Sequence, residues 1–345
     1  MTLENNFKEH SKKYIFSNNN ILSKEREATF KKISSNNFEK RNNESLKNIT
    51  FSDLSLFKYF YEPPKESTNI KVLNNDKYEI QIINGKCKSY EDKNIEIRNI
   101  KESDFLTLTE KYNDNQDDLI IDFNKIFLNS GFFFNVKSNS KIQLKIIHIT
   151  DENNTIFQNN FFNFNKNCNV LLEDEYNVSH NTINNINYNI QAHEESSIKH
   201  NIFQNFSNTN KLYLSSNIIC EKKSSYKQNT FNFAQGFVRN FHNAKLNGEF
   251  SYASLEGCFF LKDKNISSNK TYITHNAENC QSNQTYKGIL NHESKANYYS
   301  NTFVAKDAQK TEGYQLSKGI LLTDNCYFFS KLELRIFADD VKCSH

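Results

Sequence analysis

The stretch Tyr286-Lys-Gly-Ile-Leu290 contains a motif, Lys-Gly-Ile-Leu, that returns as Lys318-Gly-Ile-Leu321 after 31 residues. A weaker echo relates Ala305-Lys-Asp307 to Ala338-Asp-Asp340, which lie 33 residues apart. A repeat of about 30 residues that contains several short strands is typical of a solenoid, in which each coil packs only on its neighbours. The repeat is therefore compatible with a coiled solenoid such as a parallel β-helix, whose coils stack about 4.8 Å apart.

Strand patterns dominate the chain from Lys77 onwards. Apolar and polar residues alternate in successive short segments, and this period of two is the signature of a half-buried strand. No helical stretch of ten or more residues follows Ser140, so the pattern excludes a sheet built from βαβ units. Eight Gly and two Pro are fewer than the turns of a β-sandwich normally contain. The expected strands are Tyr78–Ile83, Ile95–Ile100, Ile142–Ile149, Val170–Leu172, Ile186–Ile190, Leu212–Leu214, Tyr286–Leu290 and Leu332–Phe337.

The chain is expected to divide into a helical N-terminal segment, residues 1–65, and a β-strand lead-in with the β-helix core, residues 66–345. In the first part, i,i+4 charge pairs between Lys24 and Lys31 and helical spacing of apolar residues predict short helices. The only two prolines, which are consecutive, end this part. Leu119–Leu128 fits a short helix or a strand, and the spacing of its charged residues favours the helix.

Asparagine is abundant, with 55 of the 345 residues, and the mean hydropathy is −0.75. The asparagines interleave with periodic apolar residues instead of forming pure polar runs, so prion-like disorder is the weaker interpretation. In stacked coils, asparagine side chains can hydrogen-bond to one another along a ladder. A β-helix therefore gives the asparagine content a structural use.

The net charge and the hydropathy of the chain indicate where the protein is located and which classes of partner it binds. With 43 basic and 40 acidic residues, the formal net charge of +3 gives no electrostatic footprint for nucleic acid. No apolar run approaches the ~20 residues that cross a bilayer, and the first residues lack the layout of a signal peptide. We expect a cytoplasmic protein that binds neither nucleic acid nor membrane.

The cysteines and most histidines give no metal or disulfide signature. The seven cysteines form no CxxC pair, and an odd, scattered count without an export signal argues against a disulfide framework. Zinc-site spacing is also lacking, so most cysteines are expected to be small buried apolar residues. The histidines before the C-terminal stretch lack metal-ligand spacing, and we expect surface positions for them. They are His10, His148, His180, His193, His200, His242, His275 and His292.

The last residues, Leu332-Glu-Leu-Arg-Ile-Phe-Ala-Asp-Asp-Val-Lys-Cys-Ser-His345, hold the sharpest candidate site. A turn at Asp339-Asp340 interrupts the alternation, which then restarts with Cys343 and His345 on one face. Two residues of an extended chain span about 6.5 Å, so the thiol and the imidazole can converge on one ligand. The neighbouring Lys342 would favour the thiolate.

These residues also carry a family resemblance. Ala338–His345 resembles the C-terminal signature of the SufB/SufD family of iron–sulfur cluster assembly proteins, and the SufD branch, with ADDVKCSHGAT, is most similar. The likeness runs from about Ile120 to the end and is dense only after Gly248. Upstream stretches that also fit are Tyr286–Leu290, Ser300–Phe303, Ala308–Leu316 and Ile320–Leu322.

The resemblance implies a right-handed parallel β-helix and a non-catalytic scaffold subunit of a SufBCD-type complex that assembles iron–sulfur clusters. It implies edge-to-edge pairing with a SufB-like subunit through the last coils, together with a SufC-like ATPase. His345 matches a histidine linked to the nascent cluster, so His345 and Cys343 are the candidate metal ligands at the partner interface. This chain alone is not expected to bind a cofactor stably. The family's helical C-terminal domain, which binds SufC, would follow His345, where this sequence ends.

Two alternatives remain open at this point. One is a carbohydrate-active β-helix enzyme, for which Glu173-Asp-Glu175 could supply an acid and a base. A solvated charged turn is the expectation for this run, because nothing places two carboxylates on either side of a cleft. Asp117-Asp118 and Asp339-Asp340 fail as catalytic pairs, since adjacent strand residues point to opposite faces. The other alternative is a decayed SufD copy with only a structural role.

Overall fold

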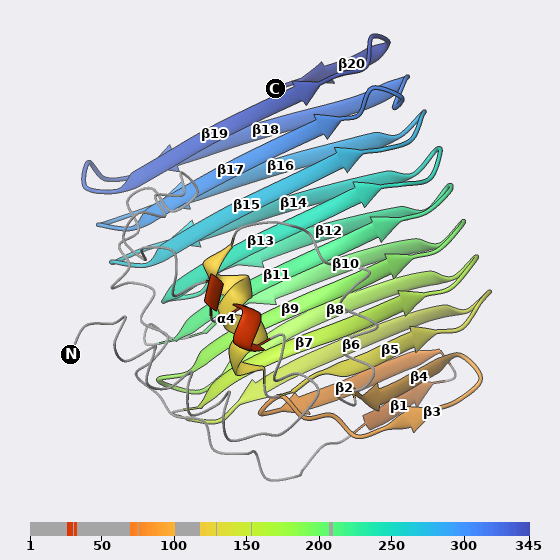
Figure 1. Cartoon of the computed structure of the whole chain (residues 1–345). Helices are drawn as coiled ribbons and strands as arrows, with labels where there is room; N and C mark the ends of the chain where they lie inside the picture. The colour runs from red at the N-terminus through yellow and green to blue at the C-terminus, as the bar shows by residue number, and fades with distance from the viewer. Residues whose placement is uncertain are drawn as a thin grey trace.

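The computed structural model describes residues 26–29, 31–32, 70–74, 76–100, 118–128, 130–152, 154–206 and 210–345. Two ten-stranded sheets enclose one apolar core, and the chain alternates between them to form a β-solenoid (Figure 1). Most neighbouring strands within a sheet are parallel and come from successive coils. The predicted parallel β-helix is therefore confirmed.

Each sheet collects every second strand of the chain. Sheet A contains β1 (Ile70–Asn74), β2 (Lys77–Ile83), β6 (Lys141–Thr150), β8 (Asn169–Val178), β10 (Ser197–Gln204), β12 (Ser225–Asn232), β14 (Tyr252–Leu261), β16 (Gln281–Leu290), β18 (Thr311–Leu321) and β20 (Val341–Ser344). Sheet B contains β3 (Tyr90–Glu91), β4 (Ile95–Asn99), β5 (Phe132–Val136), β7 (Thr155–Phe164), β9 (Ile183–Ala192), β11 (Lys211–Cys220), β13 (Phe237–Leu246), β15 (Ile266–His275), β17 (Lys295–Val304) and β19 (Tyr327–Ile336).

Successive coils stack in register. Lys141 of β6 pairs with Asn169 of β8, so equivalent positions here lie 28 residues apart. The offset grows to 31 between β16 and β18, where Lys287 pairs with Lys318. The Lys-Gly-Ile-Leu motif therefore occupies the same positions on two neighbouring coils, as the sequence indicated.

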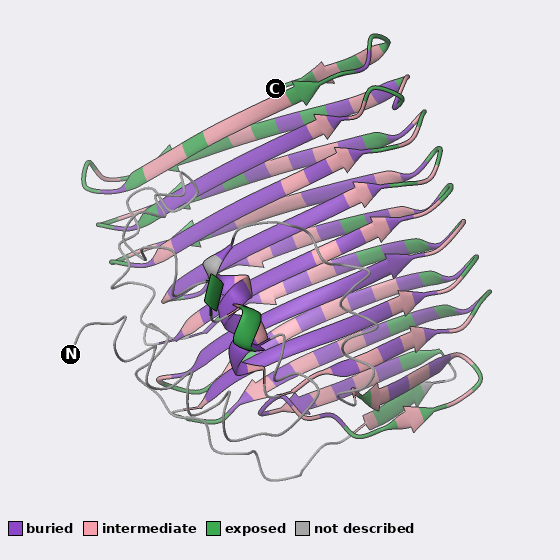
Figure 2. Cartoon of the chain, viewed as in Figure 1, coloured by how far each residue is buried: buried purple, intermediate pink, exposed green. Residues whose placement is uncertain are grey.

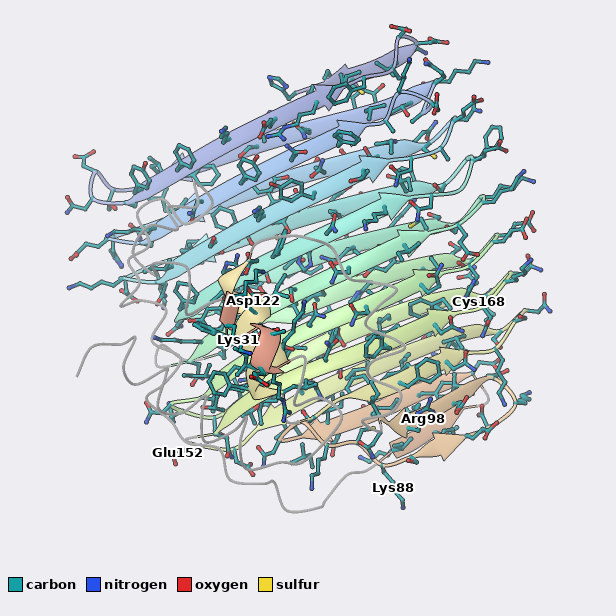
Figure 3. All side chains as sticks on the ribbon, viewed as in Figure 1. Lys31, Lys88, Arg98, Asp122, Glu152 and Cys168 are labelled. Atoms are coloured by element: carbon teal, nitrogen blue, oxygen red, sulfur yellow. The ribbon has the colours of Figure 1, made fainter. Side chains whose placement is uncertain are left out.

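The turns explain how the solenoid manages with few glycines. In the seven turns that lead from sheet B to sheet A before β6, β8, β10, β12, β14, β16 and β18, one non-Gly residue lies in the left-handed region, with φ between 56° and 61°. The N–H of this residue donates to a carbonyl of the next coil, as Asn167 does to Glu194. The turns therefore satisfy one another's backbone groups, and Figure 3 labels Cys168 in this row and Glu152 in the opposite row. The left-handed residues are Asn139, Asn167, Glu195, Lys223, Phe250, Asn279 and Lys310.

Asparagine ladders run along the solenoid, as the composition predicted. In sheet B, Asn187 Nδ2 donates to Asn159 Oδ1 over 3.1 Å. In sheet A, Asn229 Nδ2 donates to Asn201 Oδ1 over 2.9 Å. Each bond joins equivalent positions on adjacent coils, so a stacked side-chain amide is satisfied by the amide beside it.

The two sheets differ in burial (Figure 2). In β8 of sheet A, buried positions alternate with half-buried or exposed ones, whereas every position of β9 in sheet B is buried. The helix α4 (Leu119–Phe127) lies across the outer face of sheet B, against β7 and β9. Asn124 of α4 donates to the carbonyls of Gln158 and Asn185 over 3.1 and 2.8 Å. The helical alternative for this segment is confirmed.

Asp118 fixes the N-terminus of α4. Its carboxylate accepts from the backbone N–H groups of Ile120 and Ile121 over 3.0 and 3.3 Å, the arrangement of an N-cap. Arg239 of β13 forms an ion pair with the same carboxylate. Burial opposes the ionisation of Asp118, but Arg239 holds its pKa below the ordinary value. Asp118 therefore ties the helix to the solenoid.

Only a small part of the predicted N-terminal helical segment is described. Residues 26–29 and 31–32 are helical. Arg26 donates to the carbonyl of Leu128 over 2.8 Å, and the Lys32 ammonium lies 3.1 Å from the Asp122 carboxylate on α4. The rest of the segment and the predicted boundary after residue 65 lie outside the described residues. In the part of the chain that the structure describes, no helix is long and apolar enough to cross a membrane.

Candidate functional site

The predicted site lies on the last strand, β20. After β19 the chain bends at Asp339 and Asp340, which confirms the expected turn, and it then pairs in parallel with β18. Cys343 lies opposite Gly313 of β18, and His345 follows the strand. His345 is exposed, whereas Cys343 is half buried.

The Cys343 thiol faces the end of the apolar core. It packs against a small cluster formed by Val304, Ala308 and Ala338. Gly313 makes room for it, because a Cβ at this position would lie only 3.3 Å from Cys343 Sγ. The environment of the thiol is therefore set by residues of the preceding coil.

This environment disfavours the thiolate. Burial raises the pKa of the Cys343 thiol above its ordinary value. Lys342 points to the opposite face, where its ammonium lies 3.5 Å from the Glu312 carboxylate. The expectation that Lys342 favours the thiolate is wrong, because consecutive side chains of a strand point apart. Cys343 must lose its proton to a base or to a metal before it can act as a ligand.

Cys343 and His345 form no complete metal site by themselves. Within the described residues, no three His, Cys, Asp or Glu side chains are grouped so that they could hold a metal ion. A four-coordinate site that uses both residues would need further ligands from elsewhere. The arrangement offers one exposed imidazole and one half-buried thiol next to an incomplete strand edge.

The last coil is open on the side away from the rest of the solenoid. β20 pairs with Thr311–Tyr314 of β18, so Gln315–Leu321 have no strand partner on that side among the described residues. β19 is likewise the outermost strand of sheet B. Apolar side chains at this end remain accessible, with Leu321 50% and Ile336 38% exposed.

A polar cluster that the sequence did not predict lies inside the middle coils. Asp174 of β8 accepts a hydrogen bond from His200, whose Nε2 lies 2.9 Å from Oδ2, and His148 Nε2 lies 3.6 Å from Oδ1, within ion-pair distance. The Tyr226 hydroxyl lies 2.7 Å from His200 Nδ1, and the Tyr188 hydroxyl lies 2.8 Å from His148 Nε2. All five side chains are buried, and they connect four successive strands of sheet A with sheet B.

Asp174 is the carboxylate of this cluster. Burial opposes its ionisation, but the imidazoles of His148 and His200 hold its pKa well below the ordinary value. Burial raises the pKa of Tyr188 and of Tyr226 well above the ordinary value, so both hydroxyls stay neutral. A buried carboxylate bonded in this way stabilises one stacking of the coils and has no access to solvent.

Two expectations fail at this cluster. The run Glu173–Glu175 lies on β8 and not in a turn, with Asp174 inside the solenoid and Glu175 outside, 2.9 Å from the Lys145 ammonium. Its carboxylates therefore cannot face one another across a cleft. Surface positions were also wrong for four histidines, because their strands direct them inward to partners on other coils. These buried residues are His148, His200, His242 and His275.

The cysteines confirm the expectation of small buried residues. All seven are free, and five of them are buried. Cys168 occupies the buried turn position that Ser196 and Ser224 hold on the next two coils, where the serine hydroxyls donate to carbonyls three residues earlier over 2.6 and 2.7 Å. This recurring small residue was not predicted, although the sequence has a Ser or Cys directly before six successive strands of sheet A. The positions are Ser140, Cys168, Ser196, Ser224, Ser251 and Cys280.

Comparison with known proteins agrees with this geometry. Residues 105–345 match the family described as SUF system FeS cluster assembly, SufBD core domain. The iron–sulfur cluster assembly protein SufD of Escherichia coli is 26% identical over 133 residues, which are 39% of this chain and 31% of that protein. An iron–sulfur cluster assembly SufBD family protein of Synechocystis is 32% identical over 85 residues, 25% of this chain and 19% of that protein. The aligned segments therefore cover less than a third of either relative.

The family match spans most of the chain and includes the solenoid from β5 to β20 as well as the Cys343 and His345 positions. The resemblance read from the C-terminal signature is thereby confirmed. The chain belongs to the SufBD core family of the SUF system, which assigns it a role in iron–sulfur cluster assembly.

Proposed function

We propose that this protein is a non-catalytic, cytoplasmic scaffold subunit of a SufBCD-type complex. It pairs with a SufB-like subunit and acts with a SufC-like ATPase, which supplies the energy of ATP hydrolysis. The proposal rests on family membership together with the position of Cys343 and His345 on and next to β20. The one observation that carries the pairing is the group of accessible apolar side chains at this end of the solenoid, close to Cys343 and His345.

Strand addition is the mode of pairing that we propose, with strands of the two subunits joining edge to edge through the last coils, as in β-augmentation. The accessible apolar side chains Leu321 and Ile336 would be buried in the same contact. A SufB-like solenoid that adds a strand here would extend sheet A across the two subunits.

His345 and Cys343 would then lie at the boundary between the subunits. An exposed imidazole can bind iron at once when neutral, whereas the Cys343 thiol has a raised pKa and is deprotonated on binding. The nascent cluster is cargo of the complex and takes its remaining ligands from the partner. His345 is thus the first ligand and Cys343 the second.

The proposal is tested by reconstitution with a SufB-like subunit and a SufC-like ATPase. We expect His345→Ala to lower the yield of assembled cluster, measured by absorbance, at unchanged recovery of the complex. His292→Ala is the matched control, because His292 is also exposed but lies in a turn beside Asp263. An unchanged yield for His345→Ala would remove this residue from the site.

The pairing itself has a separate test. Replacing Leu321 by Asp puts a charge among the exposed apolar side chains of the last coil, and because Leu321 lies in register with the buried Leu290, thermal unfolding of the variant checks that the fold is retained. We expect co-purification of the SufB-like subunit to fall by at least tenfold. Retention of the partner at wild-type level would contradict pairing through the last coil.

A further inference from the structure

Packing explains the glycine and the leucine of the repeated Lys-Gly-Ile-Leu motif, which face inward. A Cβ on Gly288 would lie 2.0 Å from the Phe259 ring, and a Cβ on Gly319 would lie 2.4 Å from the Phe328 ring. Each glycine therefore makes room for an inward-pointing phenylalanine. Leu290 is fully buried in the core. Neither contact explains the lysine and isoleucine of the motif, which face outward.

The outward isoleucines continue an apolar column on the outer face of sheet A. Phe260 pairs in register with Ile289, and Ile289 with Ile320, so the three side chains stack on successive coils. They are 41%, 39% and 57% exposed. Leu316, on the same face of β18, is 37% exposed. Three or more accessible apolar side chains in one column are typical of an interaction surface.

The outward lysines lie directly opposite each other on neighbouring strands. Lys287 pairs with Lys318, and both are exposed. Like charges at directly opposite positions repel each other. Elsewhere on this face, Lys145 lies 2.9 Å from the Glu175 carboxylate. Within the described chain, neither Lys287 nor Lys318 has a carboxylate within ion-pair distance. A bound anionic group between the two ammonium groups would relieve the repulsion.

We propose that this surface binds an acidic amphipathic α-helix of a partner protein. The surface, here called the Lys–Ile patch, consists of Phe260, Lys287, Ile289, Leu316, Lys318 and Ile320. It lies on the outer face of sheet A and includes three residues of β18, a strand of the last coils through which pairing with the SufB-like subunit is proposed. The inference goes beyond the proposed function, because it concerns the outward side chains and a different partner, and it does not depend on that function.

The spacing of the patch fits a helix that runs along the solenoid axis. Stacked strands lie about 4.8 Å apart, and side chains at i and i+3 or i+4 of a helix lie about 5–6 Å apart. Leucines on one stripe of the helix would cover Phe260, Ile289 and Ile320. Glutamates on the neighbouring stripe would lie over Lys287 and Lys318. The charge pair gives specificity, and the apolar column supplies buried area.

The test uses a synthetic probe of this chemistry. The probe is a fluorescent peptide with Leu on one helical stripe and Glu on the next. It has about 20 residues, because a helix of this length can form in water. We expect binding to the full chain by fluorescence anisotropy, weakened by salt. The double variant Lys287→Glu with Lys318→Glu should bind at least tenfold more weakly. Lys141→Glu with Lys199→Glu is the matched control, since both lysines are exposed on sheet A outside the patch.

Several outcomes would overturn the proposal. The first is that the Glu peptide does not bind. The second is that a peptide with Gln at every Glu position binds with the same affinity as the Glu peptide. The third is that the Lys287/Lys318 variant binds the Glu peptide as tightly as the wild type does. Sedimentation that shows self-association lost in this variant would assign the patch to a second copy of the chain. Binding of the wild type to anionic phospholipid vesicles, but not to the peptide, would assign it to a membrane surface. Circular dichroism of each variant confirms that the solenoid is intact.

Discussion

Leu290 and Leu321 show how the middle coils differ from the last one. Both end a Lys-Gly-Ile-Leu motif, and they are paired in register on β16 and β18. Leu290 is fully buried, whereas Leu321 is 50% exposed. The local sequence is the same, so the difference comes from the next coil, which covers Leu290 and not Leu321. In a solenoid, burial is contributed by neighbours about 30 residues away in both directions.

The same contrast applies to polar groups. In the middle coils the buried carboxylate of Asp174 accepts a hydrogen bond from His200 and lies within ion-pair distance of His148, both from adjacent strands. In the last coil, Cys343 is only half covered and His345 is exposed. The middle coils can therefore stabilise groups that have no contact with solvent, while the last coil keeps ligating groups accessible. The predictions below test this contrast, beginning with the largest expected effect.

Removing Asp174 should destabilise the middle coils most. Asp174→Ala leaves His200 buried without its acceptor and removes the ion-pair contact of His148, and breaking a buried pair in this way costs about 3–5 kcal/mol. Urea unfolding followed by circular dichroism measures the change. Glu173→Ala, the adjacent residue on the outer face, is the control and should change the free energy of unfolding by less than about 0.5 kcal/mol. Equal effects of the two variants would contradict the role of the buried cluster.

Acid should weaken the middle coils through His242. Burial, assisted by the charge of His200, lowers the pKa of His242 to about 3, while the unfolded chain has a pKa near ~6.5. The unfolded state alone takes up this proton below pH ~6.5, so stability is complete above that pH and falls as the pH drops. The loss is about 2 kcal/mol at pH 5.

Unfolding free energies between pH 7 and 5 measure this dependence. His242→Gln should remove that part of the slope, and the exposed His292→Gln should leave it unchanged. His275, whose pKa burial lowers to about 4, contributes in the same direction and will remain in both variants. A slope unaffected by His242→Gln would show that His242 is accessible to protons in the folded state.

Two glycines allow a matched comparison of the coils. Gly288→Ala brings a Cβ against the Phe259 ring, which is 3% exposed and cannot move aside, so overpacking should cost about 1–3 kcal/mol. Gly319→Ala meets the Phe328 ring, which is half buried and can shift, so the cost should be under about 1 kcal/mol. Thermal unfolding of both variants gives the difference. A larger loss for Gly319→Ala would mean that the last coil is as tightly packed as the middle.

The strands and the solenoid could be predicted because the alternation is local and the Lys-Gly-Ile-Leu repeat marks the coil length. The buried histidines could not, since His200 finds its acceptor Asp174 26 residues away on another strand. Small side chains that recur every 27–29 residues before sheet A strands were present in the sequence but carry no hydrophobic signal. At the candidate site, alternation correctly separated Cys343 from Lys342. The raised pKa of Cys343 depends on Val304 and Ala308, which belong to the preceding coil.

The smallest effect concerns reactivity and not stability. Cys343 is half buried with a raised pKa, so iodoacetamide should modify it in the native protein more slowly than a free thiol, and faster as the pH rises. Cys220 is fully buried in the middle coils, where burial raises its pKa to about 12, and should react only after unfolding in urea. Mass spectrometry of timed digests measures both rates. Rapid modification of Cys343 at neutral pH would show that its thiolate is stabilised after all, and the contrast between the last coil and the middle coils would then lie in charge as well as in accessibility.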